Sequence, residues 1–246
     1  LAPQPDRPVG GSREPATWAH PLGTDLLGRD VFSRAVHATR VAVGVSLVPL
    51  LIALPLGVGL GVAAGYRRGA VDSFVVFLTS TFASVPPILL LVATSFLLGK
   101  GLTAVYVAIG AVSWVDLCRV VRAETLRHSQ RSHLDSASLA GAGPLRLLWT
   151  HLLPGIWPTV LVQTLIQAIQ AVKGEAILSF IGVGVQTQPS FGLMLADSRQ
   201  DILQGTWTQF LAATAGVLVL VLALNLLAEA LSPNPTRDAP TPRSTS

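Results

Sequence analysis

The sequence contains very little cysteine and little charge, and these two scarcities narrow the class of protein. Cys118 is the one cysteine among 246 residues, so an intramolecular disulfide is excluded and this chain alone cannot form a thiolate metal site. Charged residues make up 12% of the chain, whereas a soluble domain carries about a quarter. Half of the residues are hydrophobic, and the mean hydropathy is +0.58. The composition therefore predicts a polytopic membrane protein rather than a soluble domain.

The sequence also lacks the motifs of common catalytic and metal sites. It has no GxxxxGKS/T phosphate-binding loop and no GxSxG nucleophile motif. His128, His133 and His151 lack the spacing of a metal-binding HExxH pair. We therefore expect no catalytic residues, no metal site and no cofactor bound by this chain. The net charge of +4 and the pI near 10.0 need no nucleic-acid partner, because basic cytoplasmic loops of a membrane protein explain them.

Five apolar stretches are each long enough to cross about 30 Å of hydrocarbon at about 1.5 Å per residue. They lie near residues 41–65, 73–98, 102–122, 156–183 and 209–231. The first is rich in glycine, which lets helix backbones approach closely in lipid. The second contains Pro86-Pro87, which must kink or break it. The pattern predicts an all-α transmembrane helical bundle with five visible spans.

The distribution of basic residues predicts the orientation of these spans. An odd number of spans puts the two termini on opposite sides of the membrane. With the C-terminus inside, nine basic residues are cytoplasmic: Arg67, Arg68, Arg119, Arg122, Arg127, Arg131, Arg146, Arg237 and Arg243. Five near span ends are outside: Arg29, Arg34, Arg40, Lys100 and Arg199. Because the cytoplasmic side carries the excess of basic residues, we place the C-terminus inside, although the three N-terminal arginines argue the other way.

This orientation divides the chain into three parts. Residues 1–40 are an extracytoplasmic segment, in which an apolar stripe beginning at Val31 predicts an interfacial helix on the outer face. Residues 41–231 are the transmembrane domain, with a cytoplasmic loop at 119–155. Residues 232–246, rich in Pro, Ser, Thr and Arg, are expected to form a disordered cytoplasmic tail.

The polar loop between the third and fourth spans carries a distinctive spacing. Asp135-Ser136-Ala137 is followed by Gly141 and later by Leu153-Pro154. This spacing resembles the EAA loop of bacterial ABC-importer permeases, which docks on the ATPase subunit. Asp135 stands for the usual Glu, Ser136 for the first Ala, and His151 for an aliphatic residue.

Two further motifs resemble one family of these permeases. Residues 20–34, which read HPLGTDLLGRDVFSR, resemble the HPLGTDxxGRDxxSR segment of the C-type subunit in the dipeptide/oligopeptide/nickel family. Residues 175–195 resemble that family's EAxLSFLGxGxQPPxPSWGxML segment. Phe191 stands there for Trp, and Thr187 and Gln188 lie near the usual proline pair.

The resemblance implies a type I ABC-importer permease fold with six helices, so we expect a first helix to precede Leu1. It also implies partners: a homologous permease forming a heterodimer, two cytoplasmic ATPase subunits that bind ATP and Mg, and an extracytoplasmic solute-binding protein. The chain would then be a multi-pass protein of the bacterial inner membrane and would form half of a solute pathway. Di- and oligopeptides are the expected solutes, and nickel, glutathione or another small solute remains open.

The resemblance assigns ATPase coupling to the polar loop. Its small residues allow backbone to approach a partner, and its glycines permit a turn. The candidate coupling residues are Asp135, Ser136, Ala137, Ala140, Gly141, Gly143, Arg146, Leu153 and Pro154. The alternative is an ordinary amphipathic cytoplasmic loop.

A polar face on the fourth span is the candidate wall of the solute pathway. Gln163, Gln167 and Gln170 follow a spacing of four and three residues, which places them on one helix face. Polar side chains in lipid are costly and normally face protein or water. Helix–helix hydrogen bonding is the competing interpretation. Glu175 and Pro86 are the other pathway candidates, and Glu175 has a second interpretation as a structural ion pair with Lys173 or an interhelical contact.

The sequence gives less support to two other classes of function. A self-sufficient channel or secondary transporter would show inverted repeats or an intramembrane charge relay, and neither is visible. Asp116, Arg119 and Arg122 are spaced by three residues, which favours a charged cytoplasmic helix end with an internal pair. An intramembrane enzyme lacks a recognisable nucleophile or metal set.

Overall fold

The structure, a computed structural model, describes residues 6–99, 101–130 and 143–232. Its elements are α1 (Val31–Leu47), α2 (Leu50–Arg67), α3 (Gly69–Ala83), α4 (Pro87–Leu98), α5 (Leu102–Ser129), α7 (Pro144–Leu147), the π-helix η1 (Leu148–Leu152), α8 (Leu153–Ile181), α9 (Phe191–Leu203) and α10 (Thr208–Leu231). Within these ranges there is no β-strand, only two isolated bridges, Pro8 with Arg29 and Thr24 with Asp30. The predicted all-α class is confirmed.

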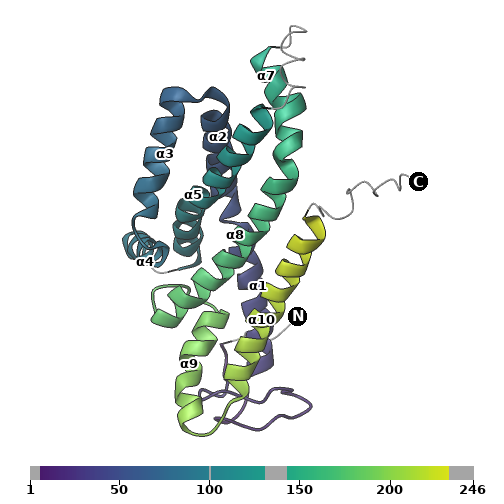
Figure 1. The fold of residues 1–246 in the computed structure, drawn as a ribbon. Coiled ribbons are helices and arrows are strands. Elements are labelled where there is room, and N and C mark those ends of the chain that lie inside the picture. Colours follow the sequence, from purple (N-terminus) through teal and green to yellow (C-terminus); the bar gives the residue numbers. More distant parts are fainter. Residues whose placement is uncertain (1–5, 100, 131–142, 233–246) are drawn as a thin grey trace, which may run out of the picture.

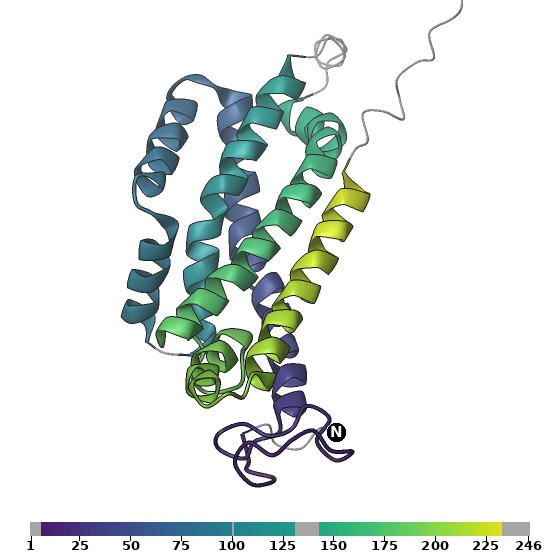
Figure 2. The ribbon, with the colours of Figure 1, turned by 60° about the horizontal axis from the view of Figure 1, so that its bottom comes forward.

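The helices form an elongated bundle with two distinct ends (Figure 1). The turn-rich segment 6–30 lies beside α9 at one end, and α7 lies at the other (Figures 1 and 2). Four helical segments are long and apolar enough to cross a membrane: Val31–Arg67, Leu102–Ser129, Leu148–Ile181 and Thr208–Leu231. The pair α3 and α4 passes the same test together. The five predicted spans therefore each correspond to a helical segment or helix pair.

The second predicted span is broken rather than merely kinked. Helices α3 and α4 meet at an angle of 83°. Pro87 opens α4, where its missing N–H costs no helical hydrogen bond. Pro86 has extended backbone, with φ −54° and ψ 129°, because a residue that precedes proline is disfavoured in the helical region. The proline pair therefore produces the break that the sequence predicted.

The helix expected within residues 1–40 corresponds to the start of α1, and its interfacial position stays a prediction. Residues 6–30 are mostly turns, and the helix starts only at Val31. The Asp30 carboxylate caps it by accepting hydrogen bonds from the backbone N–H groups of Phe32 and Ser33. The apolar stripe that predicted the helix belongs to the first turns of α1, which leads directly into α2.

Helices α2 and α5 run parallel and pack closely. Gly57 faces Leu117, Gly61 faces Cys118 and Val121, and Gly65 faces Thr125. A Cβ atom on Gly61 would lie 2.8 Å from the Cys118 carbonyl oxygen. Only a residue without a side chain allows this approach. The glycine-rich first span is therefore explained by its seam with α5.

Candidate functional site

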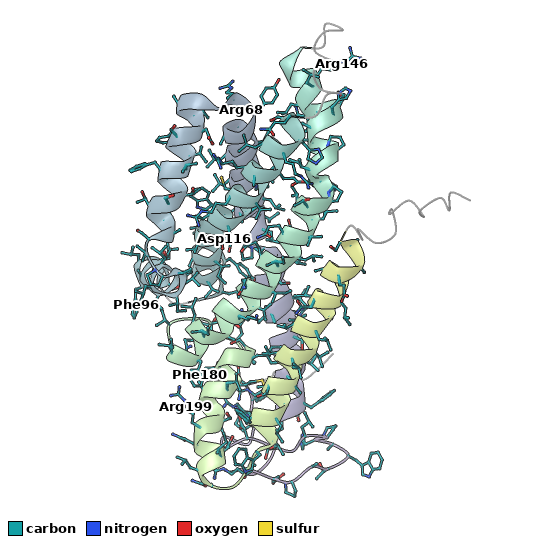
Figure 3. The ribbon with its side chains drawn as sticks, viewed as in Figure 1. Arg68, Phe96, Asp116, Arg146, Phe180 and Arg199 are labelled. Atoms are coloured by element: carbon teal, nitrogen blue, oxygen red, sulfur yellow. The ribbon has the colours of Figure 1, made fainter. Side chains whose placement is uncertain are left out.

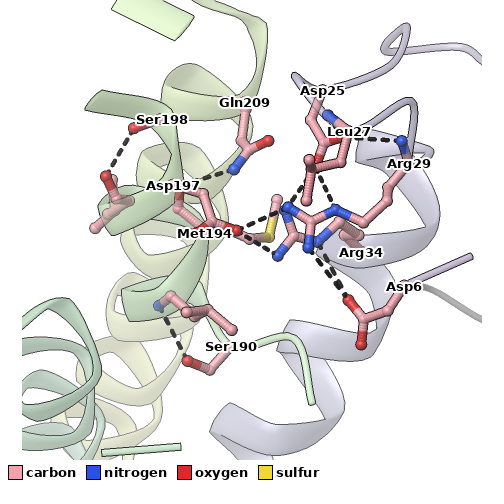
Figure 4. Close-up of polar contacts among 12 residues, drawn as sticks. Asp6, Asp25, Leu27, Arg29, Arg34, Ser190, Met194, Asp197, Ser198 and Gln209 are labelled. Atoms are coloured by element: carbon pink, nitrogen blue, oxygen red, sulfur yellow. Dashed lines mark hydrogen bonds and ion pairs between the residues drawn. The ribbon is translucent and has the colours of Figure 1, made fainter. Parts of the chain in front are cut away.

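At one end of the bundle, the structure brings the first family-like motif against α9. Arg34, at the end of the first motif, is 0% exposed. Its Nη1 donates to Oδ2 of Asp25 at 2.9 Å, and its Nη2 donates to Oδ2 of Asp197, on α9, at 2.8 Å. Figure 4 shows this guanidinium between the two carboxylates. A buried arginine is tolerated here because both carboxylates compensate its charge.

Arg29 contacts the same two acids. Its Nε donates to Oδ2 of Asp25 at 2.6 Å, and its Nη2 donates to Oδ2 of Asp197 at 2.9 Å. Oδ1 of Asp25 accepts the backbone N–H groups of Leu27 and Arg29, both at 2.9 Å. Asp25 thus holds the turn of the motif in shape while it binds both arginines. We call Asp25, Arg29, Arg34 and Asp197 the arginine–aspartate network.

A second ion pair attaches the N-terminal segment to α9. Arg13 Nε lies 3.1 Å from Oδ1 of Asp201. Asp201 is 1% exposed, and burial raises the pKa of its carboxyl group, while the hydrogen bond from Arg13 opposes that rise. Next to the network is a cavity of about 370 Å³, lined by Asp25, Leu26, Leu27, Arg29, Ala196, Asp197, Arg199, Gln200, Asp201 and Gln209. Segment 6–30 and α9 therefore form one polar cap on the bundle.

The 175–195 motif forms the corner between α8 and α9. Ser179 Oγ donates to Oε1 of Glu175 at 2.6 Å and accepts the backbone N–H of Val185 at 2.9 Å. A Cβ atom on Gly192 would lie 2.4 Å from the Ala176 carbonyl oxygen, so α9 packs directly on the α8 backbone. Glu175 is 1% exposed, and no ion pair with Lys173 is present among the described residues. This geometry supports the interpretation of Glu175 as a structural group.

The other pathway candidates occupy different environments. Gln167 is buried at 4% exposure, Gln163 is half-buried, and Gln170 is exposed. Pro86 is exposed at the break between α3 and α4. The glutamines share a helix face, but only Gln170 of the three presents its side chain openly in the single chain. The pathway role of these residues stays a prediction.

The expected coupling loop is only partly within the described residues. Asp135, Ser136, Ala137, Ala140 and Gly141 lie outside them. Gly143, Arg146 and Pro154 are exposed, and Leu153 is half-buried. Figure 3 places Arg146 at the same end of the bundle as Arg68. The described flanks of the loop therefore lie at the end opposite the polar cap.

Two sets of contacts fix the helices that flank the loop. His128, near the end of α5, has Nε2 3.2 Å from Oε1 of Glu124, and its ring lies so close to Gly155 that a Cβ there would be 2.9 Å from Nδ1. Arg122 forms a two-pronged ion pair with Asp72 on α3, and its Nη2–Oδ2 distance is 2.7 Å. The His128 ring thus packs the end of α5 on the start of α8, and the Arg122–Asp72 pair attaches α5 to α3.

An apolar groove lies beside the start of α8. It measures about 610 Å³ and is lined by Val58, Gly59, Val62, Ala63, Tyr66, Arg67, Leu148, Trp149 and Leu153. Among the candidate coupling residues that the structure describes, Leu153 lines this groove. The other described candidates, Gly143, Arg146 and Pro154, are exposed.

The structure contradicts the ion pair that was predicted for Asp116. The internal pair expected for Asp116 and its neighbouring arginines does not form among the described residues, since Arg122 binds Asp72 and Arg119 Nη2 donates to the Thr79 carbonyl at 3.2 Å. Asp116 is exposed half-way along α5 (Figure 3). Its distance from the last turn of α5 was the available signal that it does not belong to the charged helix end.

Known proteins share both the sequence pattern and the fold. The Di/tripeptide transport system permease protein DppC of Pseudomonas aeruginosa is 35% identical over 90% of this chain and 72% of its own length. The Glutathione transport system permease protein GsiD of Pectobacterium atrosepticum is 33% identical, over 92% and 73%. The Nickel transport system permease protein NikC of Escherichia coli is 36% identical, over 86% and 76%.

A solved structure of the MetNI methionine ABC transporter in an inward-facing conformation contains a chain with a similar fold. The TM-score is 0.61 at 23% identity, covering 82% of this chain and 96% of that chain. This likeness supports the type I importer permease fold. Residues 57–237 match the family described as binding-protein-dependent transport system inner membrane component. The chain therefore belongs to this family of multi-pass inner-membrane permeases of ABC importers.

Proposed function

We propose that this chain forms half of a pathway for di- and oligopeptides, paired with a homologous permease subunit. The observation that carries the proposal is the 35% identity with the di/tripeptide permease of Pseudomonas aeruginosa over 90% of the chain. Nickel and glutathione are the competing solutes, favoured by comparable identities with NikC and GsiD. Family membership argues against the ATP-independent channel considered from the sequence.

Two partner ATPases, which bind ATP and Mg, supply the energy in this proposal. The sequence has no phosphate-binding loop of its own. Closure of the ATPases would move the loop that contains Asp135 and Gly141, and the motion would reach α5 and α8 as a rigid-body shift. The packing of His128 on Gly155 and the ion pair of Arg122 with Asp72 support such transmission, because they attach the ends of α5 and α8 to neighbouring helices.

The polar cap at the opposite end is the proposed receiver of the solute-binding protein. Its exposed rim includes Arg199 and Gln200 on α9. The arginine–aspartate network keeps this rim in a fixed position relative to α1. A docked binding protein would therefore act on α1 and α9 together.

Reconstitution tests the proposed function. The purified importer, with its second permease and ATPases, is placed in liposomes with ATP at the ATPase side and the binding protein at the other side. We expect ATP-dependent uptake of labelled alanyl-alanine, with no competition from nickel or glutathione. ATP-dependent uptake of nickel or glutathione without peptide uptake would replace the peptide assignment by the competing one.

A further inference from the structure

A carboxylate is exposed in the middle of a membrane-spanning helix. Asp116 lies fourteen positions after Leu102 in the 28-residue helix α5, which corresponds to about 21 Å along the axis at about 1.5 Å per residue. Its side chain is exposed, while the adjacent residues Val115 and Leu117 are buried in the bundle. Asp116 therefore points away from the interior of this chain.

The parallel neighbour α2 shows how deep this carboxylate lies. Leu117 packs on Gly57, and Thr125 packs on Gly65. The charged end of α2 at Arg67 lies ten positions beyond Gly57, about 15 Å further along the axis. Since the hydrocarbon core is about 30 Å thick, and the Arg122–Asp72 pair lies about 9 Å further along α5, Asp116 lies inside the core.

No cation of the described chain compensates this charge. Arg119, the nearest arginine on α5, donates to the Thr79 carbonyl on α3. Arg122, one turn further, is bound to Asp72. The ion pairs of the described residues do not include Asp116. The carboxylate is free to bind a cation from outside the chain.

An unpaired carboxylate at this depth does not face lipid, because a charged side chain in hydrocarbon is expensive and normally faces water or a partner. We propose that Asp116 lines the solute pathway and binds a positively charged group of the passing solute. The inference rests on the proposed function, in which this chain forms one wall of the pathway. In this role Asp116 is a specificity residue that favours cationic solutes and disfavours anionic ones.

The chemistry fits transient binding. A single carboxylate in a hydrated path attracts an ammonium group without the multiple contacts that would hold it. The neighbouring Ser113, one turn earlier and half-buried, offers a hydroxyl but no charge. Asp116 would therefore discriminate between solutes by their charge rather than by their shape.

The transport test compares two peptides of opposite charge in the reconstituted importer. Asp116→Asn should lower the uptake ratio of alanyl-lysine to alanyl-glutamate on the order of fivefold, the size of one exposed charge contact. Asp116→Glu, which keeps the carboxylate, should restore most of the ratio. An unchanged ratio in Asp116→Asn overturns the inference. Loss of the second permease from the purified Asp116→Asn complex also overturns it, since that result assigns Asp116 to an ion pair between subunits.

A labelling experiment tests whether position 116 is accessible to water, and it needs no solute. Asp116→Cys, in a Cys118→Ser background, is exposed to a cationic membrane-impermeant thiol reagent in the purified, lipid-reconstituted importer. Leu218→Cys, an exposed apolar position on α10 at 65% exposure, is the control for a lipid-facing site. Reaction at position 116 but not at 218 supports the pathway assignment, and no reaction at 116 overturns it. If the wild-type importer moves no peptide, the proposed function fails, and labelling still decides the location of Asp116.

Discussion

Arg34 and Asp197 are 163 positions apart in the chain, yet the Arg34 Nη2 and the Asp197 Oδ2 lie 2.8 Å apart. The pair joins the helix that begins the transmembrane domain to the short helix α9. Arg34 has no exposed surface, whereas Asp197 retains 32% side-chain exposure. The ion pair therefore joins a buried arginine to a partly exposed aspartate.

Removing the buried arginine should destabilise the polar cap. Arg34→Gln leaves Asp25, which is 1% exposed as a side chain, with Arg29 as its remaining cation. Breaking a buried pair costs about 3 kcal/mol or more, so we expect a clear fall in the thermal unfolding midpoint of the purified complex. Arg40→Gln, an exposed change on the same helix, is the matched control. Equal midpoints for the two variants would contradict the structural role of Arg34.

The Arg13–Asp201 pair predicts a pH-dependent stability. Burial raises the pKa of Asp201 above its ordinary value of 3.8, so the protonated acid favours folding. Its favourable contribution is complete below that value and is lost as pH rises through the raised pKa. Arg13→Gln removes the group that opposes the rise, so its destabilisation should be larger at pH 7.5 than at pH 4.5. Unfolding midpoints at both pH values measure this.

Asp201→Asn provides the control for that prediction. Without a titrating carboxyl at position 201, Arg13→Gln should cost the same at both pH values. A pH-dependent difference that persists in the double variant would show that another group is responsible.

The seam between α2 and α5 predicts opposite effects of two similar changes. Gly61→Ala places a methyl group 2.8 Å from the Cys118 carbonyl oxygen and from Val121, and overpacking of this kind costs about 1–3 kcal/mol. Gly59→Ala, half a turn away on the same helix, has no atom within 4 Å of the new methyl group and should be neutral or slightly stabilising. Thermal unfolding of the two variants compares them directly. A seam that tolerates alanine at both positions would contradict this packing.

Substitutions of two glutamines on α8 test whether this helix face contacts the solute or packs against other helices. Gln167→Leu changes a buried side chain. If this face packs between helices, the change should lower the unfolding midpoint, by about 0.6–2 kcal/mol where an interhelical hydrogen bond in the membrane is lost. Gln170→Leu changes an exposed side chain and should alter the ranking of transported solutes with little loss of stability. Uptake of several solutes and the melting temperature are measured in parallel. If Gln170→Leu leaves the ranking unchanged, the pathway role of this face is wrong.

The coupling loop supplies a prediction from sequence alone. Gly141→Trp inserts a large side chain where close backbone contact with an ATPase is expected. The ATPase subunits should co-purify poorly with this variant, and uptake should fall. Arg146→Ala, at the exposed edge of the same region, should have a smaller effect. A Gly141→Trp complex that stays intact and active would contradict the docking role.

Local chemistry made several features predictable from the sequence. Pro86-Pro87 predicted the break between α3 and α4 because proline acts on its own backbone and on the residue before it. Hydropathy predicted the spans because a membrane of fixed thickness selects their length. Both rules need only a short window of residues.

Long-range pairing was not predictable in this way. Arg29 and Arg34 entered the charge count as ordinary basic residues of an outer segment, although both bind Asp197. Their acidic partner, Asp197, lies after four intervening spans, and no local pattern connects it to the two arginines. The lack of an ion pair at Asp116 was unpredictable for the same reason. Arg119 and Arg122 bind groups on α3 rather than a carboxylate on their own helix.

The ion pair of Arg34 with Asp197 also sets an order of events during biosynthesis. The ribosome must add 163 further residues after Arg34 before its partner exists. At about 5–20 residues per second this takes on the order of 10–30 s. Throughout that time the N-terminal segment lacks its ion pairs with α9. Chains that stop short of α9 therefore leave Arg13, Arg29 and Arg34 without their partners on that helix.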